Sequence, residues 1–248
     1  MGRSDEMGCA IVNFYKFLSL SSLPDIRMQL KKEAKELGLL GTILLAPEGI
    51  NCALAGPREA LIRYIDFLET HLSFNVEGAK WSESDKPPFK RMEVKLKRWI
   101  IRFAEGDDPT IPRIETAARM PPKEVFEALS NKPEDFIVVD TRNDYETDAG
   151  MFEGAVRLPI KTFTQFPEAF LKEFADKKDK TILFYCTGGV RCEKVVPWAV
   201  DRGFAKATQI DGGILKYFEE YGSAHYQGGC FVFDDRLEVD IAEVNLQK

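Results

Sequence analysis

One cysteine in this sequence, Cys186, lies in a segment whose residue types and spacing suit nucleophilic chemistry. It follows the apolar run 181–185 and precedes a helical pattern that begins near Cys192. The loop between them consists of Thr187, Gly188, Gly189, Val190 and Arg191. Such an apolar run is typical of a central parallel strand, and open α/β sheets place their sites at the carboxyl ends of these strands.

Three features of this active-site loop favour a thiolate at Cys186. Its two glycines let backbone N–H groups turn inward, the helix start adds partial positive charge, and Arg191 adds a full charge. All three lower a cysteine pKa. We therefore predict that Cys186 and Arg191 are the catalytic residues. The same loop would also hold a persulfide or an oxyanion.

The other cysteines lack these surroundings, and most free cysteines are small buried hydrophobic residues. We expect Cys9, Cys52 and Cys192 to be packing residues, with a resolving thiol as the alternative for Cys192. The five cysteines include no CxxC pair and are odd in number, so a reduced, cytoplasmic protein is the simplest account.

Charged residues near the loop are expected to support it. Arg142 and Glu146 are predicted to form a structural ion pair beneath the loop, and Asp140, at the end of a strand, to brace it. Glu193 in the first turn of the following helix is interpreted as matching the helix dipole. The two histidines, His71 and His225, have no ligand partners at suitable spacing, so no metal site is predicted.

The order of elements predicts an α/β protein with two domains. Residues 1–8 are expected to be a disordered lead without the apolar core of a signal peptide. Residues 9–103 fit a ferredoxin-like α+β sandwich. Its predicted strands are 10–20, 42–46, 50–55 and 91–97, and its predicted helices are 25–37 and 58–71.

A linker is expected over 104–120, followed by a parallel α/β domain over 121–226. Its predicted strands are 136–140 and 181–185, and its predicted helices are 123–130, 165–174, 192–202 and 214–221. Pro197 predicts a kink in the third of these helices. The tail, 227–248, contains an apolar run and is expected to dock. No apolar run is long enough to span a membrane.

Residues 86–102 form a basic strip in an otherwise acidic chain. They include seven basic residues and one acidic residue, Glu93, whereas the whole chain carries a formal net charge of −6. Strand alternation places Arg91, Lys95 and Lys97 on one face together with Glu93. Such a strip indicates an anion site, and the alternative is a solvated strand face.

Several motifs resemble those of known families. Asp140-Thr141-Arg142, Glu146 and the run Cys186–Lys194 resemble a rhodanese domain, with the four residues between cysteine and arginine that sulfurtransferases have, where related phosphatases have five. The wider set resembles bacterial tRNA uridine hydroxylases that carry a rhodanese domain, over roughly residues 10–240. That set comprises Gly41–Asn51, Pro88–Arg91, Asp140–Glu146, Gly212–Tyr217 and Cys230–Asp234. The chain departs from the pattern at Cys52-Ala53, where Gly-Thr is expected.

The resemblance implies oxygen-dependent hydroxylation of the wobble uridine of tRNA to 5-hydroxyuridine, with the loop cysteine essential. It also implies tRNA as partner and molecular oxygen as co-substrate; no flavin or metal motif is visible in the sequence. The cysteine would add to the pyrimidine or carry an activated sulfur or oxygen species. With tRNA as partner, the basic strip is predicted to bind it through Lys90, Arg91, Lys95, Lys97 and Arg98.

Two other functions remain open from the residues. A rhodanese-type sulfurtransferase would carry sulfane sulfur as a persulfide on Cys186, and the active-site loop supports this equally well. It leaves the basic strip unexplained. A non-enzymatic binding module is the third possibility, and the intact Cys186 and Arg191 argue against it.

Overall fold

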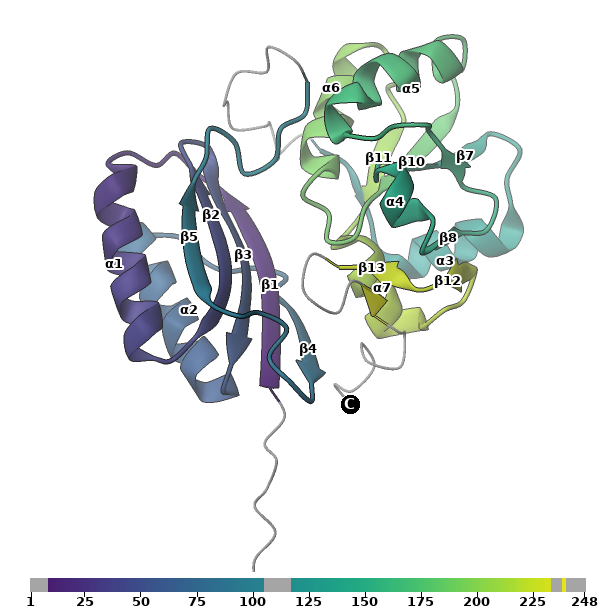
Figure 1. Cartoon of the computed structure of the whole chain (residues 1–248). Coiled ribbons are helices and arrows are strands. Elements are labelled where there is room, and N and C mark those ends of the chain that lie inside the picture. The colour runs from purple at the N-terminus through teal and green to yellow at the C-terminus, as the bar shows by residue number, and fades with distance from the viewer. Residues whose placement is uncertain (1–8, 105–116, 233–237, 240–248) are drawn as a thin grey trace, which may run out of the picture. The chain divides into compact units, whose positions relative to one another are not determined.

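The computed structural model describes residues 9–104, 117–232 and 238–239. They fall into two compact units that meet between Ile100 and Ile101 in the chain (Figure 1). The expected lead, 1–8, and most of the expected linker, 104–120, lie outside the described residues. None of the helices in the described part is long and apolar enough to cross a membrane.

The first unit is a five-stranded sheet with strand order β4-β1-β3-β2-β5. Two helices cover one face of this sheet (Figure 1), and side chains from both helices and the strands form the core between them. The elements are β1 (Cys9–Phe17), α1 (Leu23–Glu36), β2 (Leu40–Ala46), β3 (Gly49–Gly56), α2 (Arg58–Leu72), β4 (Lys80–Ser84) and β5 (Met92–Leu96). The ferredoxin-like sandwich is confirmed.

One strand of this unit was assigned wrongly from the sequence. The fourth strand of the ferredoxin-like order is β4, which pairs antiparallel with β1. The strand predicted over 91–97 is instead a fifth one, β5, which pairs parallel with β2 at the opposite edge of the sheet. The run Lys-Trp-Ser-Glu-Ser has too few apolar residues to indicate a strand, as is common at sheet edges.

Both cysteines of the first unit are packing residues, as predicted. Cys52 is 1% exposed and aligns with Phe14 on β1 and Ile43 on β2, so the ladder runs regularly through the position where the chain departs from the family pattern. Burial raises the pKa of the Cys52 thiol. Cys9 packs in a small cluster with Ile11 and Phe89.

The second unit is built on a parallel sheet with strand order β6-β11-β10-β7-β9. Its strands and helices, to the end of the last long helix, are β6 (Arg119–Met120), α3 (Pro122–Asn131), β7 (Phe136–Asp140), α4 (Asp144–Thr147), β8 (Gly150–Phe152), β9 (Val156–Arg157), the short helix η2 (Phe163–Gln165), α5 (Phe166–Phe174), β10 (Thr181–Tyr185), α6 (Cys192–Asp201), β11 (Ala207–Ile210) and α7 (Gly213–Tyr221).

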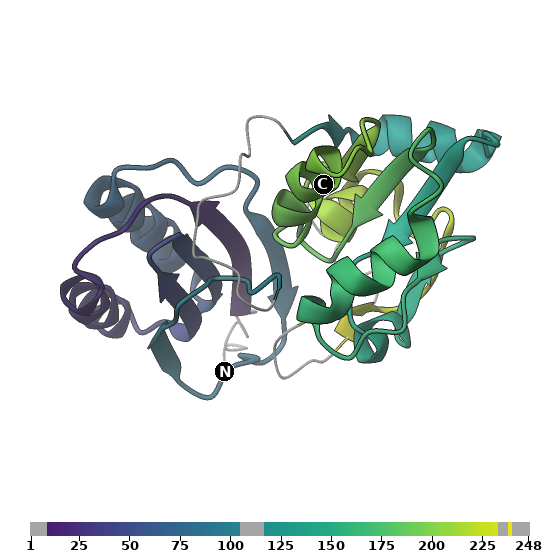
Figure 2. The same cartoon turned by 90° about the horizontal axis from the view of Figure 1, so that it is seen from above.

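Helices pack on both faces of this sheet (Figure 2). Alternate residues of β10 explain why: Ile182 and Phe184 face the core under α5 and α6, whereas Leu183 and Tyr185 face the core under α3 and α7. The predicted parallel α/β fold is confirmed. Pro197 lies inside α6, which continues to Asp201, and the kink expected there stays a prediction.

The ends of this unit differ from the sequence prediction. Arg119 and Met120, placed in the linker from the sequence, form the edge strand β6, and Phe103 packs in the core against Phe163. Beyond α7, β12 (Tyr226–Gly228) pairs antiparallel with β8, and β13 (Cys230–Phe231) pairs with β14 (Glu238–Val239). The described part of the tail therefore docks, as expected, and Cys230 is fully buried.

Candidate active site

The active-site loop joins the carboxyl end of β10 to the start of α6, so Cys186 lies where the sequence predicted it. Cys186 is 2% exposed, and its Sγ accepts a hydrogen bond from the Gly189 N–H at 3.1 Å. Gly189 has a φ of +98°, a conformation that L side chains rarely adopt. This glycine therefore permits the turn that aims a backbone donor at the sulfur.

Helix α7 holds the outer side of the loop, a contribution that residue types alone did not reveal. Two N–H groups of its first turn, those of Ile214 and Leu215, donate to the carbonyl oxygens of Cys186 and Thr187 at 3.0 and 3.1 Å. A Cβ on Gly213 would lie 2.6 Å from the Cys186 oxygen. Helix α7 thus binds the carbonyl groups of Cys186 and Thr187, while the Gly189 N–H donates to the sulfur. In the sequence, the Gly212-Gly213 pair was the one feature that could have indicated this close approach.

The electrostatic surroundings of Cys186 favour its thiolate. Burial alone would raise the pKa of the thiol. A hydrogen bond from Cys192, the charge of Arg191 and the backbone N–H groups of Arg191 and Gly189 together outweigh burial and lower the pKa of Cys186 to about 6. The thiol is therefore mostly ionised near neutral pH, unlike a free cysteine with a pKa of about 8.5.

Cys192 is a hydrogen-bond donor as well as a packing residue. It is 1% exposed, and burial together with the hydrogen bond to Cys186 raises its pKa well above the usual range. Its Sγ lies 3.8 Å from the Thr141 hydroxyl, which itself donates to the carbonyl oxygen of Tyr185 at 2.8 Å. Cys192 thus stays protonated and directs its S–H toward the Cys186 thiolate.

Removing this donor should change the titration of Cys186. Cys192→Ala is expected to raise the Cys186 pKa by roughly one unit, because a hydrogen bond to a charged group is lost. Cys192→Ser keeps an O–H donor and should raise it less. Since the thiolate is the reactive form, the acid limb of activity should move to higher pH in Cys192→Ala. Thiolate ultraviolet absorbance against pH measures the shift, and three identical curves would remove Cys192 from the stabilisation.

Arg191 is fixed by Glu146, which corrects one prediction. The Arg191 Nη2 lies 2.9 and 2.8 Å from the two carboxylate oxygens of Glu146, and neither residue is exposed by more than 5%. Glu146 also accepts the Asn143 N–H at 3.0 Å. The expected Arg142–Glu146 pair is therefore wrong: the first turn of α4 directs Glu146 at the active-site loop and fixes Arg191 there.

Arg142 pairs instead with Asp140, and both are fully buried. The Arg142 Nη2 lies 2.7 Å from the Asp140 Oδ2, and Nε contacts both carboxylate oxygens at 3.0 and 3.1 Å. Nη2 also donates to the carbonyl of Gly150 at 2.6 Å. Two residues past the end of β7, Arg142 can fold back on Asp140 and tie β7 to β8. It supports the region around the loop without contacting Glu146.

Glu193 does more than match the helix dipole. It is 5% exposed, and its carboxylate accepts hydrogen bonds from Arg119 at 2.9 and 3.1 Å and from Gln209 at 3.2 Å. These contacts connect the first turn of α6 to β6 and β11. They were invisible in the sequence because the partners are 74 and 16 residues away.

Comparison with known proteins places this site in a family. Family models match residues 9–100, described as the UPF0176 acylphosphatase like domain, and residues 122–220, the Rhodanese-like domain. A tRNA uridine(34) hydroxylase of Variovorax paradoxus is 43% identical over 230 residues, which cover 90% of this chain and 85% of the relative. Those of Bordetella petrii and Delftia acidovorans are 42% and 44% identical, covering 94% and 92% of this chain and 94% and 88% of the relatives.

The chain belongs to the tRNA uridine(34) hydroxylase family. The resemblance seen in the sequence is thereby confirmed. The rhodanese match includes the whole active-site loop together with Asp140, Arg142 and Glu146, whereas the basic strip falls largely in the N-terminal match.

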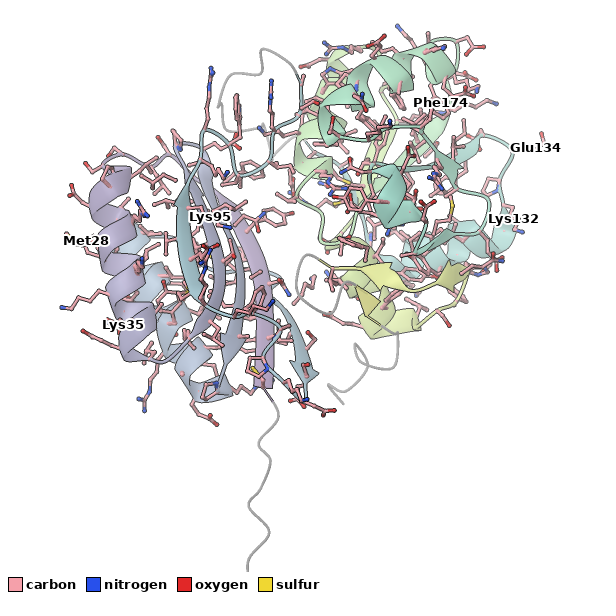
Figure 3. All side chains as sticks on the ribbon, viewed as in Figure 1. Met28, Lys35, Lys95, Lys132, Glu134 and Phe174 are labelled. Atoms are coloured by element: carbon pink, nitrogen blue, oxygen red, sulfur yellow. The ribbon has the colours of Figure 1, made fainter. Side chains whose placement is uncertain are left out.

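The basic strip of this tRNA uridine(34) hydroxylase family member is exposed but partly neutralised. The five predicted tRNA-binding residues are all exposed: Lys90, Arg91, Lys95, Lys97 and Arg98. Glu93 lies 2.6 Å from both Lys95 and Arg91, the residue directly before β5, which confirms that these three side chains lie on the same face. Figure 3 labels Lys95 on this strand. Arg98 stacks over Trp99 at 4.6 Å.

The two histidines of the chain have structural surroundings. His71 stacks on Phe67 at 5.3 Å, and His225 contacts the Ser130 hydroxyl at 2.9 Å and the ring of Phe126 at 5.2 Å. Within the residues that the structure describes, no group of three or more His, Cys, Asp or Glu side chains is placed to hold a metal ion.

Proposed function

We propose that this protein hydroxylates C5 of uridine 34 in tRNA, in the cytoplasm, with molecular oxygen as co-substrate and Cys186 as nucleophile. The observation that carries the proposal is a buried thiol at the end of β10 that accepts the Gly189 N–H at 3.1 Å, in a chain of this family. The neighbouring Cys192 and Arg191 lower the pKa of this thiol. All five cysteines are free, which fits a reducing compartment.

The chemistry starts with the thiolate. Cys186 adds to C6 of the uracil ring, which makes C5 an enolate carbon. That carbon forms a bond to molecular oxygen, and the resulting peroxide anion takes a proton from water to give a C5 hydroperoxide. Two external thiols reduce the hydroperoxide to a hydroxyl group, forming water and a disulfide. Loss of the C5 proton then expels the Cys186 thiolate and restores the double bond, and a low thiol pKa favours both addition at neutral pH and this departure.

Nucleoside mass spectrometry tests this function directly. Purified protein, tRNA lacking the modification, oxygen and a thiol reductant should yield 5-hydroxyuridine, and tRNA from cells without the protein should contain less of it. Sulfur transfer from thiosulfate to a thiol acceptor, with no 5-hydroxyuridine formed, would support the sulfurtransferase alternative instead.

The basic strip is proposed to bind the tRNA backbone. Val94 packs in the core beneath the helices, so Arg91 and Lys95 lie on the other face of the sheet, where a phosphate chain can approach. The combined variant Arg91→Ala, Lys95→Ala and Lys97→Ala should weaken tRNA binding and reduce the salt dependence of log affinity by up to about two units. Fluorescence anisotropy across a salt series measures both quantities.

Two controls sharpen this experiment. Removing Lys31, Lys32 and Lys35 from the exposed side of α1 deletes the same charge elsewhere (Lys35 is labelled in Figure 3) and should change binding little. Glu93→Gln frees Arg91 and Lys95 from their ion pairs and should strengthen binding. Equal losses in the two triple variants would mean that the strip acts only through net charge.

A further inference from the structure

One aromatic side chain is exposed beside the active-site loop. Tyr145, in α4, is 48% exposed and is the one aromatic residue among the large apolar side chains that stand exposed in the described part of the chain. An exposed aromatic ring leaves apolar surface in water, and Tyr and Trp in such places are frequent binding residues.

The ring of Tyr145 is held in a defined orientation. The ring of Phe231 on β13 meets it edge-on, with centroids 5.3 Å apart and planes at 80°. The Asn143 Nδ2 donates to the Tyr145 hydroxyl at 3.3 Å. Asn143 is 8% exposed and Phe231 is partly buried, so both supports are themselves fixed by packing. One face of the tyrosine can therefore be offered to a ligand without a large loss of side-chain entropy.

Both aromatic residues are tied to the active-site loop. Tyr145 directly precedes Glu146, whose carboxylate holds Arg191. The Thr187 hydroxyl, one residue past Cys186, donates to the carbonyl oxygen of Phe231 at 3.4 Å. Tyr145 and Phe231 thus form an aromatic shelf at the rim of the loop.

We propose that this aromatic shelf binds the uracil ring of the extruded uridine by stacking on Tyr145, which places the base beside Cys186. The inference rests on the proposed function and identifies the residue that receives the base. Enzymes that modify a base take it out of its stack and compensate by stacking it on aromatic side chains. Arg191 and the loop N–H groups then meet the base edge and the developing charge.

Three variants test the shelf. Tyr145→Ala should lower kcat/KM for tRNA by roughly 5- to 150-fold, the range expected for loss of one base–aromatic stack. Tyr145→Phe retains the ring and should remain within about threefold of wild type. Phe231→Leu frees the tyrosine ring and should give an intermediate loss. Because Tyr145 is half exposed, Tyr145→Ala should lose only its contacts with Phe231 and Asn143, and its Tm should fall by no more than a few degrees.

A tRNA with an abasic site at position 34 separates stacking from other roles. Tyr145→Ala should bind this tRNA as wild type does and bind uridine-34 tRNA more weakly, while the Cys186 titration stays unchanged. The inference is overturned if Tyr145→Ala hydroxylates tRNA normally, if both tRNAs lose affinity equally, if the thiol pKa shifts, or if Tyr145→Phe is as impaired as Tyr145→Ala. If the wild-type protein forms no 5-hydroxyuridine at all, the proposed function fails, and the abasic comparison still reports on the shelf.

Discussion

Replacing Cys186 with serine is expected to abolish 5-hydroxyuridine formation, with a loss of at least about 10³-fold. A serine hydroxyl remains protonated at neutral pH, so the loop N–H groups and Arg191 no longer hold an anion able to attack C6. The substitution is small, and the free energy of unfolding should change by no more than about 1–2 kcal/mol. Nucleoside mass spectrometry after a single turnover, beside a thermal unfolding curve, measures the two effects.

Cys9→Ser is the matched control for this variant. It makes the same chemical change at a packing cysteine of the first unit and should leave hydroxylation intact. Retained activity in Cys186→Ser would show that the thiolate is not the nucleophile. Equal loss in both serine variants would point to a general effect on folding.

Arg142→Leu is expected to destabilise the second unit by about 3–5 kcal/mol, because it leaves the carboxylate of Asp140 buried without its partner. For a unit of this size, such a loss lowers Tm by roughly 6–20 °C. Calorimetry of the full chain measures it as a shift of the transition that contains the second unit. Cys186 should also lose its low pKa at temperatures where that unit is open.

Two further variants separate burial from charge in this experiment. Arg157→Leu removes an arginine whose side chain is 37% exposed and paired with Asp144 and Asp148, and should cost no more than about 1 kcal/mol. Asp140→Leu combined with Arg142→Leu should recover part of the lost stability, since no unpaired charge remains. If Arg142→Leu and Arg157→Leu shift Tm alike, the buried pair is not a structural determinant.

The active-site loop could be predicted because its determinants are contiguous. An apolar strand, two glycines, an arginine and a helix start follow one another within residues 181–192, so local patterns were sufficient to identify Cys186. The alternation of β10 between two cores likewise follows from a short apolar run. The loop and the alternation of β10 both depend on residues adjacent in the sequence, and the structure shows both as predicted.

The partners of the charged residues could not be predicted in the same way. Choosing between Asp140 and Glu146 as the partner of Arg142 requires knowing how the chain turns after β7, which spacing does not specify. Strand β4 was missed because its residues are mostly polar. The role of Gly213 depends on a helix that returns to the loop from 27 positions beyond Cys186. The partner of Arg142, the pairing of β4 and the role of Gly213 all depend on how segments distant in the sequence come together.

The two hydrogen bonds from α7 also restrict where the active-site loop can gain or lose a residue. They join consecutive carbonyl groups, of Cys186 and Thr187, to consecutive N–H groups, of Ile214 and Leu215. An inserted residue between Cys186 and Thr187 would break this register, whereas one between Val190 and Arg191 would leave it intact. A loop widened to admit a tetrahedral phosphate group can therefore keep both hydrogen bonds only if the extra residue lies beyond Thr187, toward Arg191. The segment that carries the sulfur, Cys186–Thr187, is hydrogen-bonded to α7 and is the part of the active-site loop least tolerant of insertion.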